Sequence, residues 1–223
     1  MIELDERLSM LYNMVPPCAA AADIGADHGF LGARLLESGK CARVEFLDIS
    51  EPSLKKAWRL IRRCSLLDRA DFTVGDGVAA LKNPADAVVI AGMGAPTISG
   101  IIERGLSRLE HARLIMQPNI GADRLRADLM RMGFVICDEM IVRAGGRYYV
   151  AMAAERGQAA YTEKELLAGP VLLEKRPPDF AGYVQFRLRV QRKAYAGAVK
   201  GEAENAEALA HEIALWEEIE QCL

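Results

Sequence analysis

Short, almost continuously apolar segments alternate with amphipathic segments over the first two thirds of the chain. The segment Asp86-Ala-Val-Val-Ile-Ala91 is typical, since it carries apolar residues on both alternating faces, as expected of a strand covered by helices on each side. Five such segments predict strands over residues 19–25, 43–48, 71–74, 86–91 and 112–116. Apolar residues at intervals of three or four predict helices over residues 2–14, 30–38, 52–65, 96–107 and 124–132.

The pattern changes after Gly133. Phe134–Val142 and Arg147–Ala154 predict two strands joined by a hairpin turn at Arg143-Ala-Gly-Gly. Five βα units closed by an antiparallel hairpin define an α/β domain with a doubly wound, mostly parallel sheet of about seven strands.

Only helical patterns follow residue 161. A capping box, Thr162-Glu-Lys-Glu165, predicts a short helix that Gly169-Pro170 ends. Two longer helices are predicted, one beginning at Pro177-Pro178-Asp179 and one after Lys200-Gly201, and their apolar spacing indicates a short antiparallel coiled-coil hairpin. We therefore expect a domain over residues 1–158 and a small all-α domain over residues 159–223.

Composition narrows the class of protein. The chain has 223 residues, of which 51% are hydrophobic and 26% charged, and its net charge is -3. These values are typical of a globular protein and provide no general attraction for nucleic acid. The N-terminal segment is acidic, unlike a signal peptide, and no apolar stretch is long enough for a membrane span. The five scattered cysteines predict reduced thiols in a cytoplasmic protein and no metal site. We further expect a monomer that needs no membrane.

Small and acidic residues gather where the predicted parallel strands end, which is where ligands bind in a doubly wound sheet. Gly25 and Gly29 let the backbone approach a ligand closely. Asp48, roughly two dozen residues beyond Gly25, is placed to accept hydrogen bonds from two ribose hydroxyls. Asp76 is placed to accept one from the exocyclic amine of an adenine. Together these residues predict an adenosine site.

The absence of a dinucleotide-binding motif restricts the class of ligand further. A dinucleotide site needs G-x-G-x-x-G around a pyrophosphate, and here Asp27 replaces the middle glycine. A carboxylate repels a pyrophosphate but attracts a sulfonium and an ammonium group. S-adenosylmethionine, an adenosine with a cationic tail and no phosphate, therefore fits.

Each of these short motifs also has a purely structural interpretation. Asp23 can orient the first turn of the following helix instead of touching a cofactor, and Gly75-Asp-Gly77 alone is more often a tight turn. Their recurrence at five successive strand ends favours the functional interpretation.

The motifs Asp23-Ile-Gly-Ala-Asp-His-Gly-Phe-Leu31, Ala91-Gly-Met-Gly94 and Gln117-Pro-Asn119 together resemble the bacterial tRNA (adenine-22-N1)-methyltransferases, and the similarity extends over nearly the whole chain. The resemblance implies a Rossmann-like domain that transfers a methyl group to adenine N1 in the D-arm of tRNA. It implies that S-adenosylmethionine binds Gly25, Asp27, Asp48, Asp76, Gly92 and Met93. We add their neighbours Asp23, His28 and Gly77 to this cofactor site.

Methylation leaves adenine cationic, so a nearby carboxylate stabilises the developing charge or accepts the N6 proton. Asp27 is the predicted catalytic residue, with His28 as second choice, and the alternative is that Asp27 binds only the methionine part of the cofactor. We expect the substrate to contact Arg7, His28, Gly94, Gln117, Asn119, Arg187 and Arg192.

Arg187 and Arg192 belong to a basic stretch that is suited to a tRNA backbone. The alternative is that these arginines pair with the glutamates of the last helix. Another basic run, Lys55 to Arg63, is interpreted as a solvated helix face. Two rival functions remain open: methyl transfer to another RNA site, a small molecule or a protein, and a non-catalytic binding module of the same fold.

Overall fold

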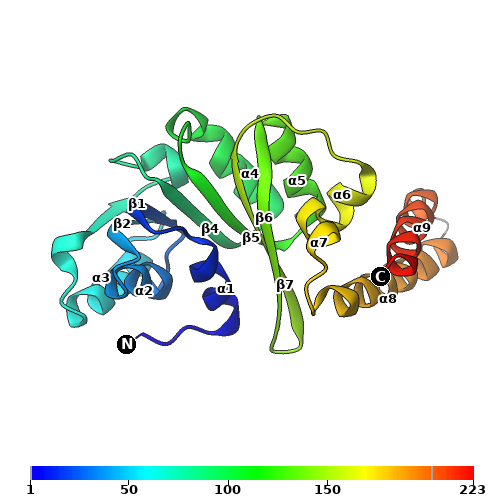
Figure 1. Ribbon diagram of the computed structural model, residues 1–223, viewed down its shortest axis with the longest axis horizontal. Helices are drawn as coiled ribbons and strands as arrows, with labels where there is room; N and C mark the ends of the chain where they lie inside the picture. Colours follow the sequence, from blue (N-terminus) through cyan, green and yellow to red (C-terminus); the bar gives the residue numbers. More distant parts are fainter. Residues whose placement is uncertain (1, 202) are drawn as a thin grey trace. The chain divides into compact units, whose positions relative to one another are not determined.

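A computed structural model describes residues 2–201 and 203–223 of the chain and contains two compact units. The first unit ends at Ala159, and the second spans Ala160–Leu223. Among the described residues the strands all lie in the first unit, and the second consists of helices and their connections (Figure 1).

The first unit is built on a seven-stranded sheet with the order β3-β2-β1-β4-β5-β7-β6. Strands β1 to β5 are parallel to one another, and β7 runs antiparallel to both β5 and β6. The strands are β1 (Cys18–Ile24), β2 (Cys41–Asp48), β3 (Ala70–Val74), β4 (Ala87–Gly94), β5 (Arg113–Ile120), β6 (Phe134–Ala144) and β7 (Arg147–Arg156). This arrangement confirms the predicted doubly wound, mostly parallel sheet with an antiparallel hairpin.

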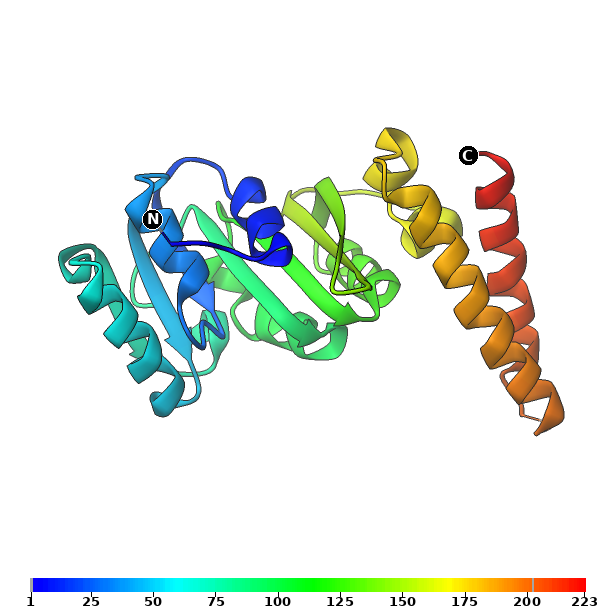
Figure 2. The same cartoon turned by 90° about the horizontal axis from the view of Figure 1, so that it is seen from below.

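Helices cover both faces of this sheet, which explains why its central strands are apolar throughout. One face is covered by α1 (Glu6–Met14), α2 (Phe30–Glu37) and α3 (Glu51–Arg63), and the other by α4 (Ala95–Arg104) and α5 (Ala122–Arg131) (Figures 1 and 2). The core beneath the first three helices contains fully buried Leu11, Leu35, Phe46 and Ile61. The close packing of both layers holds the strand ends in fixed positions.

Many element boundaries differ from the predictions by a few residues, and two of the differences have a clear physical cause. The N-terminal helix begins at Glu6 rather than at residue 2, because the Asp5 carboxylate caps it by accepting a hydrogen bond from the Leu8 N–H at 2.7 Å. The prediction of five βα units is wrong for the third, because between β3 and β4 the chain forms only a 3₁₀ turn, Gly77–Ala80. Gly77 has φ +56°, and a Cβ there would lie 2.6 Å from Ile101 of α4, so this short connection packs directly on α4.

The second unit contains α6 (Glu163–Ala168), α7 (Pro170–Lys175), α8 (Phe180–Lys200) and α9 (Ala206–Gln221). The predicted capping box is present at Thr162 and Glu165. Helix α6 ends at Ala168, which confirms the predicted stop at Gly169-Pro170, but Pro170 then opens α7, a helix that the sequence analysis does not predict. Proline suits the first turn of a helix, where its missing N–H has no partner to lose.

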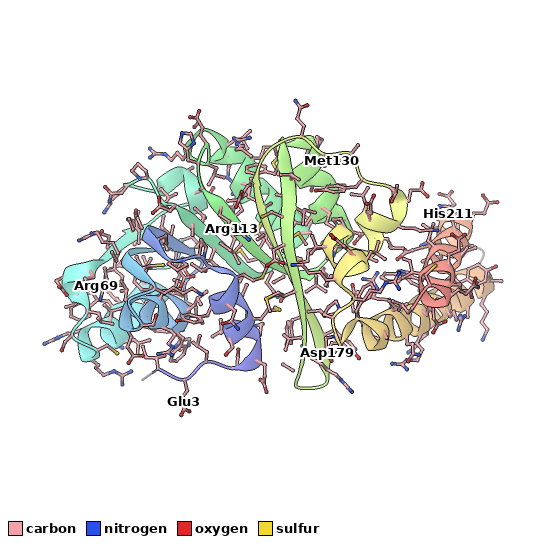
Figure 3. All side chains as sticks on the ribbon, viewed as in Figure 1. Glu3, Arg69, Arg113, Met130, Asp179 and His211 are labelled. Carbon is pink, nitrogen blue, oxygen red and sulfur yellow. The ribbon has the colours of Figure 1, made fainter. Side chains whose placement is uncertain are left out.

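Helices α8 and α9 run antiparallel within this unit (Figure 2). Trp216 of α9 is fully buried and meets the ring of Tyr183 edge-on, with the ring centroids 5.8 Å apart. His211, also on α9 (Figure 3), has its Nε2 2.9 Å from the Glu163 carboxylate of α6. The hairpin therefore has its own apolar centre, with polar contacts to the short helices.

Candidate active site

The carboxyl ends of the parallel strands form one edge of the sheet, and two cavities lie along it. The first, about 260 Å³, lies between α1 and the loop after β1 and is lined by Arg7 and residues 23–31. The second, about 340 Å³, lies over the ends of β2, β3 and β4 and is lined by Asp48, Asp76 and Met93, among others. Ile24, Gly25 and Ala91 line both cavities, so the two adjoin at the end of β1. The sheet edge that was predicted to bind a ligand therefore contains two adjoining cavities.

The loop after β1 bends sharply at this junction. Its backbone is tied to β2 by hydrogen bonds from the N–H groups of Gly25 and Ala26 to the Leu47 carbonyl, at 2.7 and 3.2 Å. Gly25 has φ +70°, and a Cβ built on it would lie 2.3 Å from the Met93 methyl group. Glycine is therefore required here both by the backbone conformation and by the space beside Met93.

Asp23 lies beneath this loop and is 8% exposed. Its carboxylate accepts a hydrogen bond from the Gly32 N–H at 3.2 Å, which is the orienting contact of the structural interpretation. Burial raises the pKa of Asp23 to about 6, the bond from Gly32 acts against this rise, and the charge of Asp48 adds to it. Contact between Asp23 and a cofactor stays a prediction.

Asp48 ends β2 and lines the second cavity. Its Oδ1 accepts a hydrogen bond from the Ser50 N–H at 2.8 Å, and its Oδ2 accepts one from the Asp27 N–H at 3.4 Å. These bonds fix the carboxylate in place, and each oxygen retains a lone pair for a further donor.

Asp27 lies in the loop after β1 and has φ +41°, which is unusual for a residue with a side chain. Its carboxylate accepts a hydrogen bond from Lys56 of α3 at 3.0 Å and lies 3.5 Å from the His28 ring nitrogen. His28 stacks on Phe30 with the ring centroids 5.7 Å apart. The predicted catalytic carboxylate therefore lies among basic partners at the opening of the first cavity.

Asp76 forms a two-point ion pair with Arg104 of α4, at 2.8 Å from Nε and 2.9 Å from a terminal nitrogen. Both residues line the second cavity. The carboxylate predicted to meet an adenine amine thus already has a cationic partner, and it can accept from a further donor only through its remaining lone pairs.

A continuous polar chain crosses the ends of β4 and β5. Arg7 of α1 donates to the amide oxygen of Gln117 at 3.0 Å, and the Gln117 amide donates to Asn119 at 3.3 Å. Asn119 in turn donates to the Gly92 carbonyl at 2.7 Å. Gly92 has φ +77°, and the adjacent Gly94 caps α4. Four of the predicted site positions, at distant places in the sequence, are therefore joined in one network.

The two predicted substrate residues of the second unit are paired within the hairpin. Arg187 of α8 lies 3.3 Å from Glu212, and Arg192 lies 2.7 Å from Glu217, both on α9. Arg187 also lies over the Trp216 ring, 5.3 Å from its centroid. The structure thus contains the internal charge pairing that the sequence left open as the alternative to RNA contact.

Sequence reasoning missed several residues that line the site. Lys56 and Arg104 hold Asp27 and Asp76, and Ile49, directly after Asp48, is 76% exposed beside the second cavity. The sequence indicated Ile49 only through its position directly after Asp48, because an apolar residue that follows an acidic strand end can cover a flat ligand. Nothing in the local pattern pairs either cation with its partner.

Among the described residues, no group of three or more His, Cys, Asp or Glu side chains is arranged to hold a metal ion. Within that same part of the chain, no helix is long and apolar enough to cross a membrane.

The fold and the glycine- and carboxylate-lined strand ends define a Rossmann-like methyltransferase, and residues 4–152 match a family model described as a methyltransferase domain. The chain is 34% identical to the tRNA (adenine(22)-N(1))-methyltransferase of Bacillus subtilis over 187 residues, covering 80% of this chain and 79% of the relative. The chain belongs to the tRNA (adenine(22)-N(1))-methyltransferase family.

Solved structures extend the similarity to both units. The crystal structure of the B. subtilis m1A22 tRNA methyltransferase TrmK matches with a TM-score of 0.89 and 27% identity, covering 99% of this chain and 100% of that one. The Streptococcus pneumoniae protein Sp1610, in complex with S-adenosyl-L-methionine, matches with a TM-score of 0.88 and 28% identity, again over 99% and 100%.

Proposed function

We propose that the chain transfers a methyl group from S-adenosylmethionine to N1 of adenine 22 in tRNA. One observation carries the proposal: Asp48 and the glycine-lined cavities lie on the same sheet edge as the polar chain from Arg7 through Gln117 to Asn119. A cofactor site and a set of hydrogen-bonding groups for a base are thereby adjacent. The names of the B. subtilis relative and of its structure support the same reaction.

The residues at the strand ends fit S-adenosylmethionine. Gly25 leaves open the space beside Met93 that a Cβ would occupy. Asp48 retains lone pairs that suit two ribose hydroxyls. Asp27 adds a negative charge, which attracts an ammonium or sulfonium group and would repel a pyrophosphate. When bound, the cofactor supplies an electrophilic methyl group.

The polar chain over β4 and β5 suits an adenine edge. Because Asn119 donates its amide N–H to the Gly92 carbonyl at 2.7 Å and accepts from Gln117, its amide orientation is fixed, and its oxygen keeps a lone pair for a donor such as adenine N6. Gly92 and Gly94 carry no side chain that would hinder a flat base. Holding the base in this way leaves N1, which is not a donor, free to react.

Asp27 and His28 are proposed to stabilise the positive charge of the methylated base and to accept its N6 proton. Methylation at N1 makes the base cationic, and the Asp27 carboxylate stabilises that charge electrostatically. The N6 proton is then transferred to the Asp27 carboxylate or to the His28 ring nitrogen, which lie 3.5 Å apart, and the methylated base becomes neutral. Lys56, bonded to Asp27, keeps the loop in one orientation while the base is held.

The test is transfer of labelled methyl from S-adenosylmethionine to unmodified tRNA, followed by nuclease digestion and mass mapping. Label at N1 of adenine 22, strongly reduced in Asp27→Ala and Asp48→Ala, is the expected result. Cofactor binding without label in tRNA would overturn the substrate and would direct attention to small molecules or proteins.

We further propose that the protein acts in the cytoplasm, where its tRNA substrate is found, as a monomer without a metal. Sedimentation of the purified chain tests the oligomeric state, and activity that is unchanged by EDTA tests the absence of a metal requirement. A dimer, or loss of activity restored by a divalent cation, would contradict the corresponding part of the proposal.

A further inference from the structure

Helix α3 lies at the outer margin of the first unit (Figures 1 and 2). It exposes a strongly basic face to solvent. Its apolar side, Leu54, Ala57, Leu60 and Ile61, is buried against the rest of the unit. The opposite side carries exposed basic side chains together with Trp58, which is 38% exposed. These basic residues are Lys55, Lys56, Arg59, Arg62 and Arg63. We call this surface, with Trp58, the α3 basic face.

Most of its charge is not neutralised by the protein. Arg59, Arg62 and Arg63 form no ion pair with any residue among 2–201 and 203–223. Arg62 instead lies over the ring of Trp58, 5.2 Å from its centroid. Like charges three and four residues apart on a helix repel each other, so this arrangement costs stability unless an anion lies against it.

The α3 basic face borders the candidate active site. A groove of about 560 Å³ is lined by His28, Lys56, Trp58 and the three unpaired arginines. His28 also lines the cavity beside Gly25, and Lys56 bonds Asp27 of the same loop. An anionic ligand in this groove would therefore continue directly into the site where the base is proposed to react.

We propose that the α3 basic face binds the phosphate backbone of the tRNA beside the methylated adenine, an inference that rests on the proposed function. Guanidinium groups suit phosphate oxygens because their planar N–H pairs bond two oxygens at once. Trp58 holds Arg62 extended over its ring and offers a flat apolar surface to an unstacked base. Arg187 and Arg192 of the hairpin are less suited to this role, because each already pairs with a glutamate.

The experiment compares the full-length chain with two double variants. Arg59→Gln/Arg63→Gln removes two charges from the α3 basic face and leaves the Arg62–Trp58 contact in place. Lys82→Gln/Arg108→Gln removes two exposed charges that line neither the groove nor the cavities, and serves as the matched control. For each protein we would measure tRNA binding over a range of salt concentrations, kcat and KM for tRNA, and the Kd for S-adenosylmethionine by calorimetry.

The α3 variant is expected to raise KM for tRNA about tenfold and to lower the slope of log K against log salt by about 2, roughly one for each lost phosphate contact. Its kcat at saturating tRNA and its Kd for the cofactor should match those of the wild type and the control. A KM and salt slope equal to those of the control would overturn the proposal. So would binding of an acidic peptide or of anionic lipid vesicles that depends on Arg59 and Arg63 while tRNA binding does not.

Failure of this inference is distinguishable from failure of the proposed function. If the wild type methylates adenine 22 and the α3 variant behaves as the control, the surface is wrong and the activity stands. If tRNA binds through the α3 basic face but receives no methyl group, the surface stands and the activity is wrong. A wild type that neither binds nor methylates tRNA would contradict both.

Discussion

Asp23→Asn is expected to make the stability of the first unit less sensitive to pH. Asp23 is 8% exposed, and its carboxylate accepts a hydrogen bond from the Gly32 N–H at 3.2 Å. Asparagine has nearly the same shape as a protonated aspartic acid, and its amide oxygen can accept the same bond. The substitution therefore removes one buried titration and leaves the loop contact intact.

The magnitude follows from the pKa of this carboxyl group. Burial raises the pKa of Asp23 from 3.8 to about 6 in the folded protein. Between these values the native state binds the proton and the unfolded state does not, so the free energy of unfolding falls as the pH rises through this range. At about 1.4 kcal/mol for each pKa unit, ionised Asp23 costs about 3 kcal/mol at pH 7. The variant should gain about 2–3 kcal/mol relative to the wild type between pH 4 and pH 7.

Urea unfolding at a series of pH values measures this difference. Trp58 emission reports on the first unit when Trp216 of the second unit is replaced by phenylalanine in every protein compared. Asp68→Asn, at an exposed position, is the matched control for the change in net charge. A difference between variant and wild type that stays constant from pH 4 to pH 7 would refute the reasoning, because Asp23 would then not be a buried carboxyl with a raised pKa.

Three further outcomes are expected. Asp48→Ala should weaken S-adenosylmethionine binding by roughly ten- to a hundredfold in calorimetry, because hydrogen bonds to a charged group contribute about 1.5–3 kcal/mol. An unchanged Kd would show that Asp48 does not belong to the cofactor site. Gln117→Ala should lower kcat on tRNA by at least about tenfold and leave the Kd for the cofactor unchanged, because it interrupts the hydrogen-bonded chain from Arg7 to Asn119. If kcat and the cofactor Kd change in parallel, the substitution distorts the whole site and the prediction is wrong. Arg126→Met should destabilise the protein by about 3–5 kcal/mol in denaturant melts, because it leaves the Glu139 carboxylate, 2.8 Å from Arg126, buried without that partner. The double variant Arg126→Met/Glu139→Leu should recover most of that loss.

Local patterns in the sequence were sufficient for most of the elements. The alternation of apolar strands and amphipathic helices predicted the parallel sheet, because a strand covered on both faces must be apolar on both. The glycines and carboxylates after the strands, such as Gly25 and Asp48, could be placed at one edge because parallel strands end on the same side. The capping box at Thr162 likewise depends on residues only three positions apart.

Where two local signals competed, the sequence was ambiguous. Gly169-Pro170 correctly predicted the end of α6, but α7, which begins at Pro170, was missed, because proline both stops a helix that precedes it and suits the first turn of one that follows. The short connection after β3 forms a 3₁₀ turn in which Gly77 packs against Ile101, a residue of another helix that no local pattern relates to it.

The sequence by itself determined most of the elements, the faces they bury and the residues that follow the strands, since these depend on spacings within a few residues. Only the tertiary structure decided the partners of the polar side chains. Arg7 meets Gln117, Lys56 meets Asp27 and Arg104 meets Asp76 only after the strands are ordered and the helices docked. Such pairs depend on strand order, on helix orientation and on the reach of individual side chains, so no local pattern records them.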